Sequence, residues 1–220
     1  MSGAANRRAG IERAEAIFAD RLASLGPGDL AIDCGANVGK ITRRLAETGA
    51  DVIAYEPDPV IFPHLERACA VYPSVTLNMA AVGIAPGEAR LLRSPYFEED
   101  PVAESEKSTI CDDALTRKRE GGWQLMDREN TATVAIVDIL SVLKTELAGR
   151  GRIAVLKLDI EGMEAPILEA MEERGLFENI DLTIAELHPW RFPEKAGDLR
   201  ALRDRLSARY APTHVNLDWG

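Results

Sequence analysis

The chain has 220 residues, which is long enough for one large domain or for one domain with an insertion. Its 36 acidic residues outnumber its 26 lysines and arginines, so the formal net charge is −10. A charge of this sign repels phosphate backbones and anionic lipid surfaces, and we therefore expect neither nucleic acid nor a membrane as a partner.

The three cysteines, Cys34, Cys69 and Cys111, lie far apart and form no CxxC pair. An odd number of scattered cysteines argues against a disulfide framework and against a zinc knuckle, and favours a reducing compartment. No stretch approaches the ~20 apolar residues of a membrane span, and the polar N-terminus has no signal-peptide core. We expect a cytoplasmic protein.

Helical and strand patterns alternate in the first part of the chain. Apolar residues at helical spacing over 11–25 predict a helix, which gives residues 1–28 the character of an N-terminal helical extension. After it, the patterns predict a strand over 30–34, a helix over 38–45, a strand over 52–55, a helix over 61–72, and strands over 75–79 and 89–92.

Residues 93–130 interrupt this alternation. The segment is polar and shows only fragments of helical spacing. Irregular segments of this length inside a compact domain are uncommon and usually functional. We expect a single domain over 1–220 in which residues 93–130 form a lid or a substrate-binding insert.

Regular patterns return after the insert. They predict a strand over 131–137, a helix over 139–147, a strand over 153–158, a helix around 167–171, a strand over 180–187, a helix over 199–206 and a last strand over 213–217. Such alternation predicts a doubly wound, mostly parallel α/β sheet with helices on both faces. Only one short strand remains at the end, so one sheet edge is expected to be open, and a homo-oligomer that covers it is one alternative.

Ligands of such sheets bind beyond the carboxyl ends of the strands, where the first predicted strand runs into a glycine loop. Gly35 permits a tight turn, and Gly39 is expected to let the start of the next helix pack close to a ligand. Asn37 occupies the position of the second glycine of a dinucleotide loop, and Asp33 would repel a pyrophosphate but suit an amino group. S-adenosylmethionine, which has an amino group and a sulfonium but no phosphate, is therefore expected rather than NAD.

Two other segments follow strands at the same edge. Glu56, followed by Pro57, lies about 20 residues after Gly35, the offset at which a carboxylate meets ribose hydroxyls. Residues 78–82, with Asn78 and Ala81, follow the third strand and are expected beside an adenine.

Charged residues also follow the most apolar strand. Lys157, Asp159 and Glu161 alternate and lie on one side of the sheet mouth, to which the next strand adds Glu186 and His188. So many charges beside a buried strand are costly unless they are paired or used. One interpretation is a catalytic cluster, and the other is an ion pair of Lys157 with helix-capping acids.

At this point the sequence resembles the FkbM family of S-adenosylmethionine-dependent methyltransferases. The resemblance rests on residues 33–39, 55–57, 78–83, 156–164 and 186–188, and the Lys-x-Asp-x-Glu-Gly-x-Glu string is the most specific. It implies S-adenosylmethionine as the cofactor and O-methylation of a sugar or a small natural-product-like acceptor. It places Asp33, Gly35, Asn37, Gly39 and Glu56 on the cofactor, with Ala36 in the same loop and Asp159 near the methionine end.

Several mechanisms stay open at this stage. His188 is the candidate general base, oriented by Glu186 or Glu161, because a histidine titrates near working pH. Alternatively, Asp159, Glu161 and His188 bind a divalent ion that acidifies the acceptor hydroxyl. A third alternative is that the reaction uses neither a histidine base nor a divalent ion. An NAD-dependent dehydrogenase and a non-catalytic cofactor-binding protein are the alternative functions; Asn37 argues against the first and the acidic cluster against the second.

Overall fold

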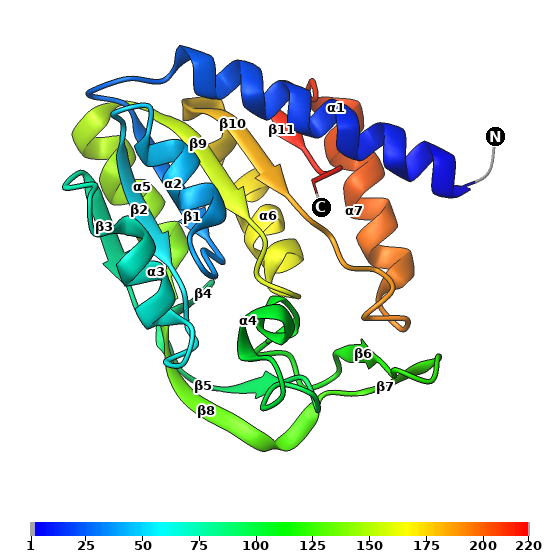
Figure 1. Ribbon diagram of the computed structural model, residues 1–220. Coiled ribbons are helices and arrows are strands. Elements are labelled where there is room, and N and C mark those ends of the chain that lie inside the picture. Colours follow the sequence, from blue (N-terminus) through cyan, green and yellow to red (C-terminus); the bar gives the residue numbers. More distant parts are fainter. Residues whose placement is uncertain (1–2, 220) are drawn as a thin grey trace.

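A computed structural model describes residues 3–219 of the chain. Its centre is a six-stranded sheet in the order β11-β10-β9-β1-β2-β3, with all neighbouring strands parallel (Figure 1). The strands are β1 (Leu30–Cys34), β2 (Asp51–Tyr55), β3 (Val75–Asn78), β9 (Ile153–Leu158), β10 (Ile180–Ala185) and β11 (Val215–Asn216). The predicted doubly wound α/β fold is confirmed.

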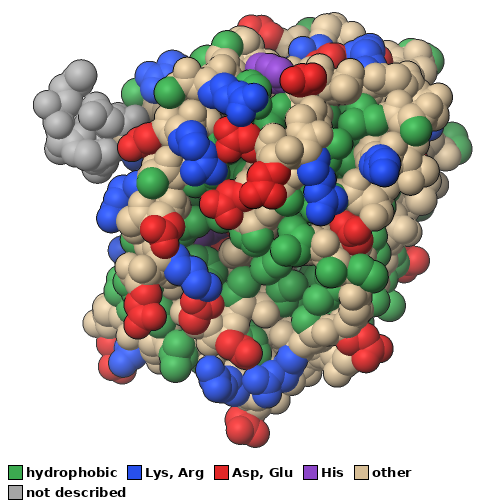
Figure 2. Space-filling model, turned by 180° about the vertical axis from the view of Figure 1, so that it is seen from behind, with side chains coloured by type: hydrophobic (Ala, Val, Ile, Leu, Met, Phe, Trp, Pro, Cys, Tyr) green, Lys and Arg blue, Asp and Glu red, His purple; other side chains and the backbone are tan. Residues whose placement is uncertain are grey.

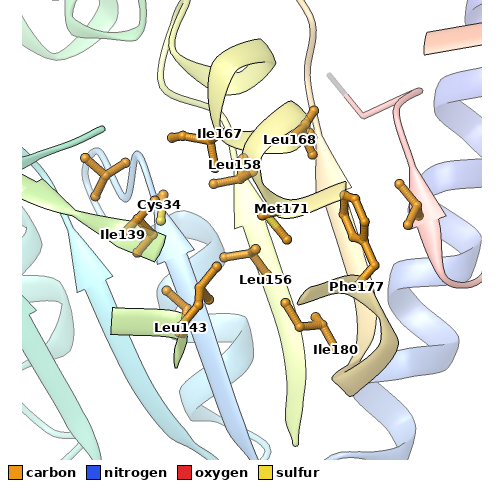
Figure 3. Packing of buried hydrophobic residues seen from close by; sticks show 14 of the residues in the cluster. Cys34, Ile139, Leu143, Leu156, Leu158, Ile167, Leu168, Met171, Phe177 and Ile180 are labelled. Atoms are coloured by element: carbon orange, nitrogen blue, oxygen red, sulfur yellow. The ribbon is translucent and has the colours of Figure 1, made fainter. Parts of the chain in front are cut away.

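Helices cover both faces of this sheet, which explains why its central strands are apolar on both sides. The helices are α1 (Gly3–Ser24), α2 (Lys40–Ala46), α3 (Phe62–Cys69), α5 (Ile139–Arg150), α6 (Glu164–Glu173) and α7 (Ala196–Arg209), with a 3-10 turn, η2 (Leu176–Asn179), before β10. One face packs against α1 and α2, through Phe18 and Leu45. The other packs against α5, α6 and α7, and Figure 3 shows Leu143 and Met171 meeting Leu156 of β9 there.

Local signals fix the ends of the helices. The Asp138 carboxylate accepts hydrogen bonds from the backbone N–H groups of Leu140 and Ser141 and so caps the start of α5. Gly151, with φ of 80°, ends that helix in the left-handed conformation that glycine adopts most readily. The chain then enters β9 directly, and β9 carries functional residues to the sheet edge.

A second sheet, of three strands, lies beside the main sheet. Strands β4 (Ala81–Gly83), β8 (Asp127–Asp138) and β5 (Gly87–Arg93) form it, in that order. The predicted strands over 89–92 and 131–137 lie within β5 and β8, which pair antiparallel. The segment between β5 and β8 contains no helix that crosses over to the main sheet, so these two strands pair with each other.

The segment over 93–130 is partly ordered rather than irregular. It contains α4 (Pro101–Glu104), η1 (Ser105–Lys107) and a hairpin of β6 (Leu115–Arg117) and β7 (Trp123–Leu125). In Figure 1 these elements lie beyond the carboxyl ends of β1, β9 and β10. The segment therefore stands where a ligand of the sheet would bind.

At its opposite edge the main sheet ends in a short strand, as the C-terminal sequence pattern predicted. Strand β11 has two residues, and it pairs parallel with Thr183 and Ile184 of β10. An antiparallel bridge from Glu186 to Asp218 continues this edge. Among the helices of residues 3–219, none combines the length and apolar character of a membrane span.

Candidate active site

A cavity of about 360 Å³, here named the sheet-edge cavity, lies at the carboxyl ends of β1, β2, β9 and β10. Most of the expected site residues line it: Gly35, Ala36, Asn37, Glu56, Pro57, Ala81, Asp159, Glu161 and Glu186. Four expected site residues do not line it: Asp33, Gly39, Asn78 and His188. The segment between β5 and β8 closes part of the cavity with Ser105, Thr109 and Ile110.

The glycine loop is shaped by its contact with β9. Gly35 has φ of 85°, and a Cβ atom at this position would lie 1.8 Å from the carbonyl oxygen of Asp159. Only glycine fits so close an approach of two backbones. Gly39 serves packing instead, because a Cβ atom there would lie 3.0 Å from Leu65 of α3. This corrects the expectation that Gly39 approaches a ligand.

Glu56 is fixed at the floor of the cavity by the backbone. Its Oε2 accepts a hydrogen bond from the N–H of Asn37 at 2.8 Å, and its Oε1 accepts one from the N–H of Asp58 at 2.9 Å. Burial raises the pKa of Glu56 to about 7, although these two bonds favour the carboxylate. Each oxygen keeps a further lone pair, so the carboxylate can accept from two ligand hydroxyls.

Asp33 lies beneath the cavity and pairs with Lys157, its neighbour on the adjacent strand. The Nζ of Lys157 lies 3.2 Å from Oδ1 of Asp33, and Oδ2 of Asp33 accepts from the hydroxyl of Thr42 at 2.7 Å. Burial disfavours the ammonium of Lys157, but Asp33 and Asp159 outweigh it and raise its pKa. Because Asp33 is fully buried, we correct the expectation that its carboxylate meets a ligand amino group directly.

Lys157 links the first strand to the exposed acid of the cavity. Its Nζ donates to the carbonyl oxygen of Gly35 at 3.0 Å and lies 3.6 Å from Oδ2 of Asp159. The side chain of Asp159 is 27% exposed, in contrast to that of Asp33. Asp159 is therefore the carboxylate of this group that a ligand can reach.

Asn78 also lies outside the cavity. Its side-chain amide donates to the carbonyl oxygen of Ala54 at 3.3 Å, which ties β3 to β2. The cavity wall that follows β3 consists of Ala80, Ala81 and Val82. The apolar residues that follow Asn78, and not Asn78 itself, form this wall, and their place beside an adenine stays a prediction.

His188 stands at the centre of an acidic cluster. Its Nε2 lies 3.3 Å from Glu161, 3.7 Å from Glu186 and 3.9 Å from Asp159, and its Nδ1 lies 3.6 Å from Glu164. Burial alone would lower the pKa of His188, but the surrounding carboxylates raise it to about 9. His188 is therefore an imidazolium at neutral pH, and the expectation that it titrates near working pH is wrong.

Glu164 has a structural role in this cluster. Its carboxylate accepts hydrogen bonds from the backbone N–H groups of Ile160, Glu161 and Gly162 at 2.7 to 2.8 Å. These bonds hold the turn between β9 and α6, in which Glu161 has a positive φ of 62°. The helix-capping interpretation of the acidic string thus applies to Glu164, whereas Asp159 and Glu161 face the cavity.

Glu186 is an acid of the cavity lining with a raised pKa. It follows β10, lines the cavity and is 15% exposed. Burial raises the pKa of Glu186 to about 7, and the nearby Asp159 and Glu161 add to this against the attraction of His188. Glu161, in contrast, has its pKa lowered below the ordinary value, because contacts with His188 and Arg191 outweigh its burial.

Arginines that sequence reasoning missed join the insert to the site. Arg93 binds the buried Asp58 through two hydrogen bonds of 2.8 and 2.7 Å. Arg191 pairs with Glu161 and donates to the carbonyl oxygens of Leu115 and Lys107 at 2.9 and 2.8 Å. Neither arginine belongs to a motif, so no sequence signal marked them.

The glycine loop itself also contacts the insert. The side-chain amide of Asn37 donates to the hydroxyl of Ser105 at 2.9 Å, and Thr109 donates to the carbonyl oxygen of Glu161 at 2.6 Å. Asn37 adopts a positive φ of 49°, which asparagine tolerates better than most residues. The expected lid segment is thus hydrogen-bonded to both sides of the cavity.

Comparison with known proteins shows similarity over parts of the chain. Ribosomal RNA small subunit methyltransferase A of Thermotoga maritima is 35% identical over 88 residues, 38% of this chain and 32% of that protein. The protein of the same name from Phenylobacterium zucineum is 46% identical over 57 residues, 26% of this chain and 20% of that protein. The chain thus matches about a third or less of the length of these relatives.

A longer match leads to the family. Methyltransferase sdnD of Sordaria araneosa is 27% identical over 176 residues, which covers 71% of this chain and 67% of that protein. The model of the methyltransferase FkbM domain matches residues 33–211, from the end of β1 to the segment after α7. The chain therefore belongs to the FkbM methyltransferase domain family.

Proposed function

We propose that this chain transfers a methyl group from S-adenosylmethionine to a hydroxyl group of a small sugar-like or natural-product-like acceptor. The observation that carries the cofactor assignment is Glu56, whose carboxylate lines the cavity after β2 with both oxygens fixed by backbone N–H groups. When bound, S-adenosylmethionine supplies an electrophilic methyl group on a sulfonium.

The other cavity residues fit the rest of this cofactor. Asp159 offers a partly exposed carboxylate for an amino group, and Ala81 and Val82 offer an apolar wall for an adenine. A dinucleotide would need close approach of a pyrophosphate to the glycine loop, where Asn37 carries a side chain that is already bonded to Ser105. This arrangement favours S-adenosylmethionine over NAD.

Glu186 is the proposed general base. The acceptor hydroxyl must lose its proton during transfer, and a base works best when its pKa lies near the operating pH. Glu186 lines the cavity with a pKa raised to about 7 by burial, whereas the protonated His188 lies behind the lining. In this proposal His188 is a positioning residue that holds Glu161 and Glu186 in place.

Metal assistance is the competing mechanism, because single donor atoms of Asp159, Glu161 and His188 lie within 4.8 Å of one another. A divalent ion there would have to displace the proton of His188 and compete with Arg191 for Glu161. Both costs favour proton transfer to Glu186 over metal activation. Unchanged turnover after treatment with a chelator would support this choice.

A small acceptor is preferred over RNA because of charge. The chain carries a net charge of −10, which opposes a polyanion. On the face shown in Figure 2, acidic and basic side chains are interspersed, and no continuous basic surface covers it. The ribosomal RNA relatives match only a part of their own length, so their substrate gives no reason to abandon this preference.

Two further assignments belong to this proposal. Residues 93–130 act as a lid within one domain, supported by the bond of Asn37 to Ser105 and by the contacts of Arg191 with Leu115 and Lys107. We also place the enzyme in the cytoplasm, supported by the free thiols of Cys34, Cys69 and Cys111.

The test is calorimetric titration with S-adenosylhomocysteine and, separately, with NAD. S-adenosylhomocysteine should bind and NAD should not. The Glu56→Gln variant should bind S-adenosylhomocysteine about tenfold or more weakly, because charge-assisted bonds to the ribose are lost. Glu66→Gln, at an exposed position on α3, is the matched control and should bind like the wild type. Binding of NAD alone would refute the proposal.

A further inference from the structure

A second cavity, here named the arginine cavity, lies where α1, α7 and the C-terminal end of the described chain meet (Figure 1). Its volume is about 530 Å³. The described residues that line it include four arginines, Arg7 and Arg13 from α1 and Arg200 and Arg203 from α7, and one acid, Asp218. The lining of this cavity is therefore positively charged, whereas the chain as a whole has a net charge of −10.

Among the residues whose side chains the structure describes, two of these arginines have no acidic partner. Arg203 pairs with Asp218, and Arg7 lies 3.4 Å from Glu186. Arg13 and Arg200 make no ion pair with any residue whose side chain the structure describes. Guanidinium groups are suited to carboxylates and phosphates because their planar forks donate two parallel hydrogen bonds.

The cavity also has an apolar wall that would contact the uncharged part of a ligand. Trp190, Leu199 and Trp219 line it together with the arginines. The guanidinium of Arg7 lies over the ring of Trp190, 4.0 Å from its centroid, which restrains this arginine. Charged groups above aromatic and aliphatic walls form a site for an organic anion rather than for a fully hydrated ion.

Two residues connect this cavity to the proposed reaction site. Trp219 lines both the arginine cavity and the sheet-edge cavity. Arg7 lines the arginine cavity and lies against Glu186, which lines the other. The two cavities therefore adjoin at Trp219 and at the ion pair of Arg7 with Glu186.

We propose that the arginine cavity binds an anionic substituent, a carboxylate or a phosphate, of the methyl acceptor. The inference rests on the proposed methyltransferase function and narrows its substrate class to acceptors with a negative charge. A polynucleotide is disfavoured, because the arginines are gathered in one concavity of an otherwise acidic chain and not along an extended track.

The test uses phenyl phosphate, benzoate and the uncharged benzyl alcohol as probes of the full chain, with S-adenosylhomocysteine present. Binding is followed by tryptophan fluorescence, since Trp190 and Trp219 line the cavity, and by calorimetry. The double variant Arg13→Glu/Arg200→Glu should bind the preferred anion about tenfold or more weakly. Phenyl phosphate and benzoate separate a phosphate site from a carboxylate site.

The matched control is Arg67→Glu/Arg174→Glu, which makes the same charge change at exposed positions outside both cavities. It should bind the anion within about twofold of the wild type. Equal loss in both double variants, equal binding of benzyl alcohol, or binding of a single-stranded RNA without binding of either small anion would overturn the proposal.

The affinity for S-adenosylhomocysteine separates the two proposals. It should be the same in the wild type and in the Arg13→Glu/Arg200→Glu variant, because neither arginine lines the sheet-edge cavity. If the wild type failed to bind S-adenosylhomocysteine, the proposed function would be wrong, whereas the anion titration of the same protein would still decide the role of the arginine cavity.

Discussion

Replacement of Gly35 by Ala tests how the glycine loop is held against β9. The new Cβ atom would lie 1.8 Å from the carbonyl oxygen of Asp159, so one of the two backbones must move. Alanine at φ of 85° costs about 1–2 kcal/mol, and relief of an overpacked contact typically costs about 1–3 kcal/mol more. The sum, about 2–5 kcal/mol, is a large part of the ~5–15 kcal/mol that stabilises a typical domain.

Urea denaturation of the Gly35→Ala variant measures this loss as a lower midpoint at unchanged slope. Gly28→Ala is the matched control, because Gly28 also has a positive φ, 96°, but a Cβ atom there would meet nothing within 4 Å. The control should lose only the conformational contribution of about 1–2 kcal/mol. If both variants were destabilised equally, the close approach of Gly35 to Asp159 would not be what selects glycine.

Three further predictions concern the acids and their partners. At saturating cofactor, kcat should rise with pH and level off above about 7, as Glu186 deprotonates. The Glu186→Gln variant should lower kcat about 100-fold without changing the affinity for S-adenosylhomocysteine. A kcat of the wild type that did not change with pH would exclude Glu186 as the base. His188→Ala should move the midpoint of that profile to higher pH, because the positive charge that lowers the pKa of Glu186 is lost, and an unmoved midpoint would contradict the positioning role. Arg93→Ala should lower the free energy of unfolding, measured by urea denaturation, by about 3–5 kcal/mol, because it leaves the buried Asp58 unpaired. Arg67→Ala, at an exposed position, should change the free energy of unfolding little. Equal losses in the two variants would show that the buried ion pair contributes nothing specific to stability.

The periodicity of apolar residues was sufficient to predict the main sheet and its helices. Strand β9 is buried at every position because helices cover both of its faces, and the nearly continuous apolar run over 153–158, interrupted only by Lys157, indicates this directly. Spacing also placed Glu56 and Asp159 at one sheet edge, since the carboxyl ends of parallel strands meet there. These features depend on local pattern and on a general rule of topology.

Contacts between distant segments were decided by the tertiary structure alone. The sequence put Asp33 and Asp159 near the same ligand, but pairing with Lys157 buries the first and leaves the second exposed. In the same way, the carboxylates around His188 raise its pKa to about 9, whereas an isolated histidine titrates lower.

The links made by Arg93 and Arg191, and the antiparallel pairing of β5 with β8, join residues that lie far apart along the chain. The local sequence determines which residues follow each strand, because periodicity is a property of neighbours. The folded chain determines which of these residues meet, and burial and charge then set their proton affinities, because both depend on groups that no local pattern specifies.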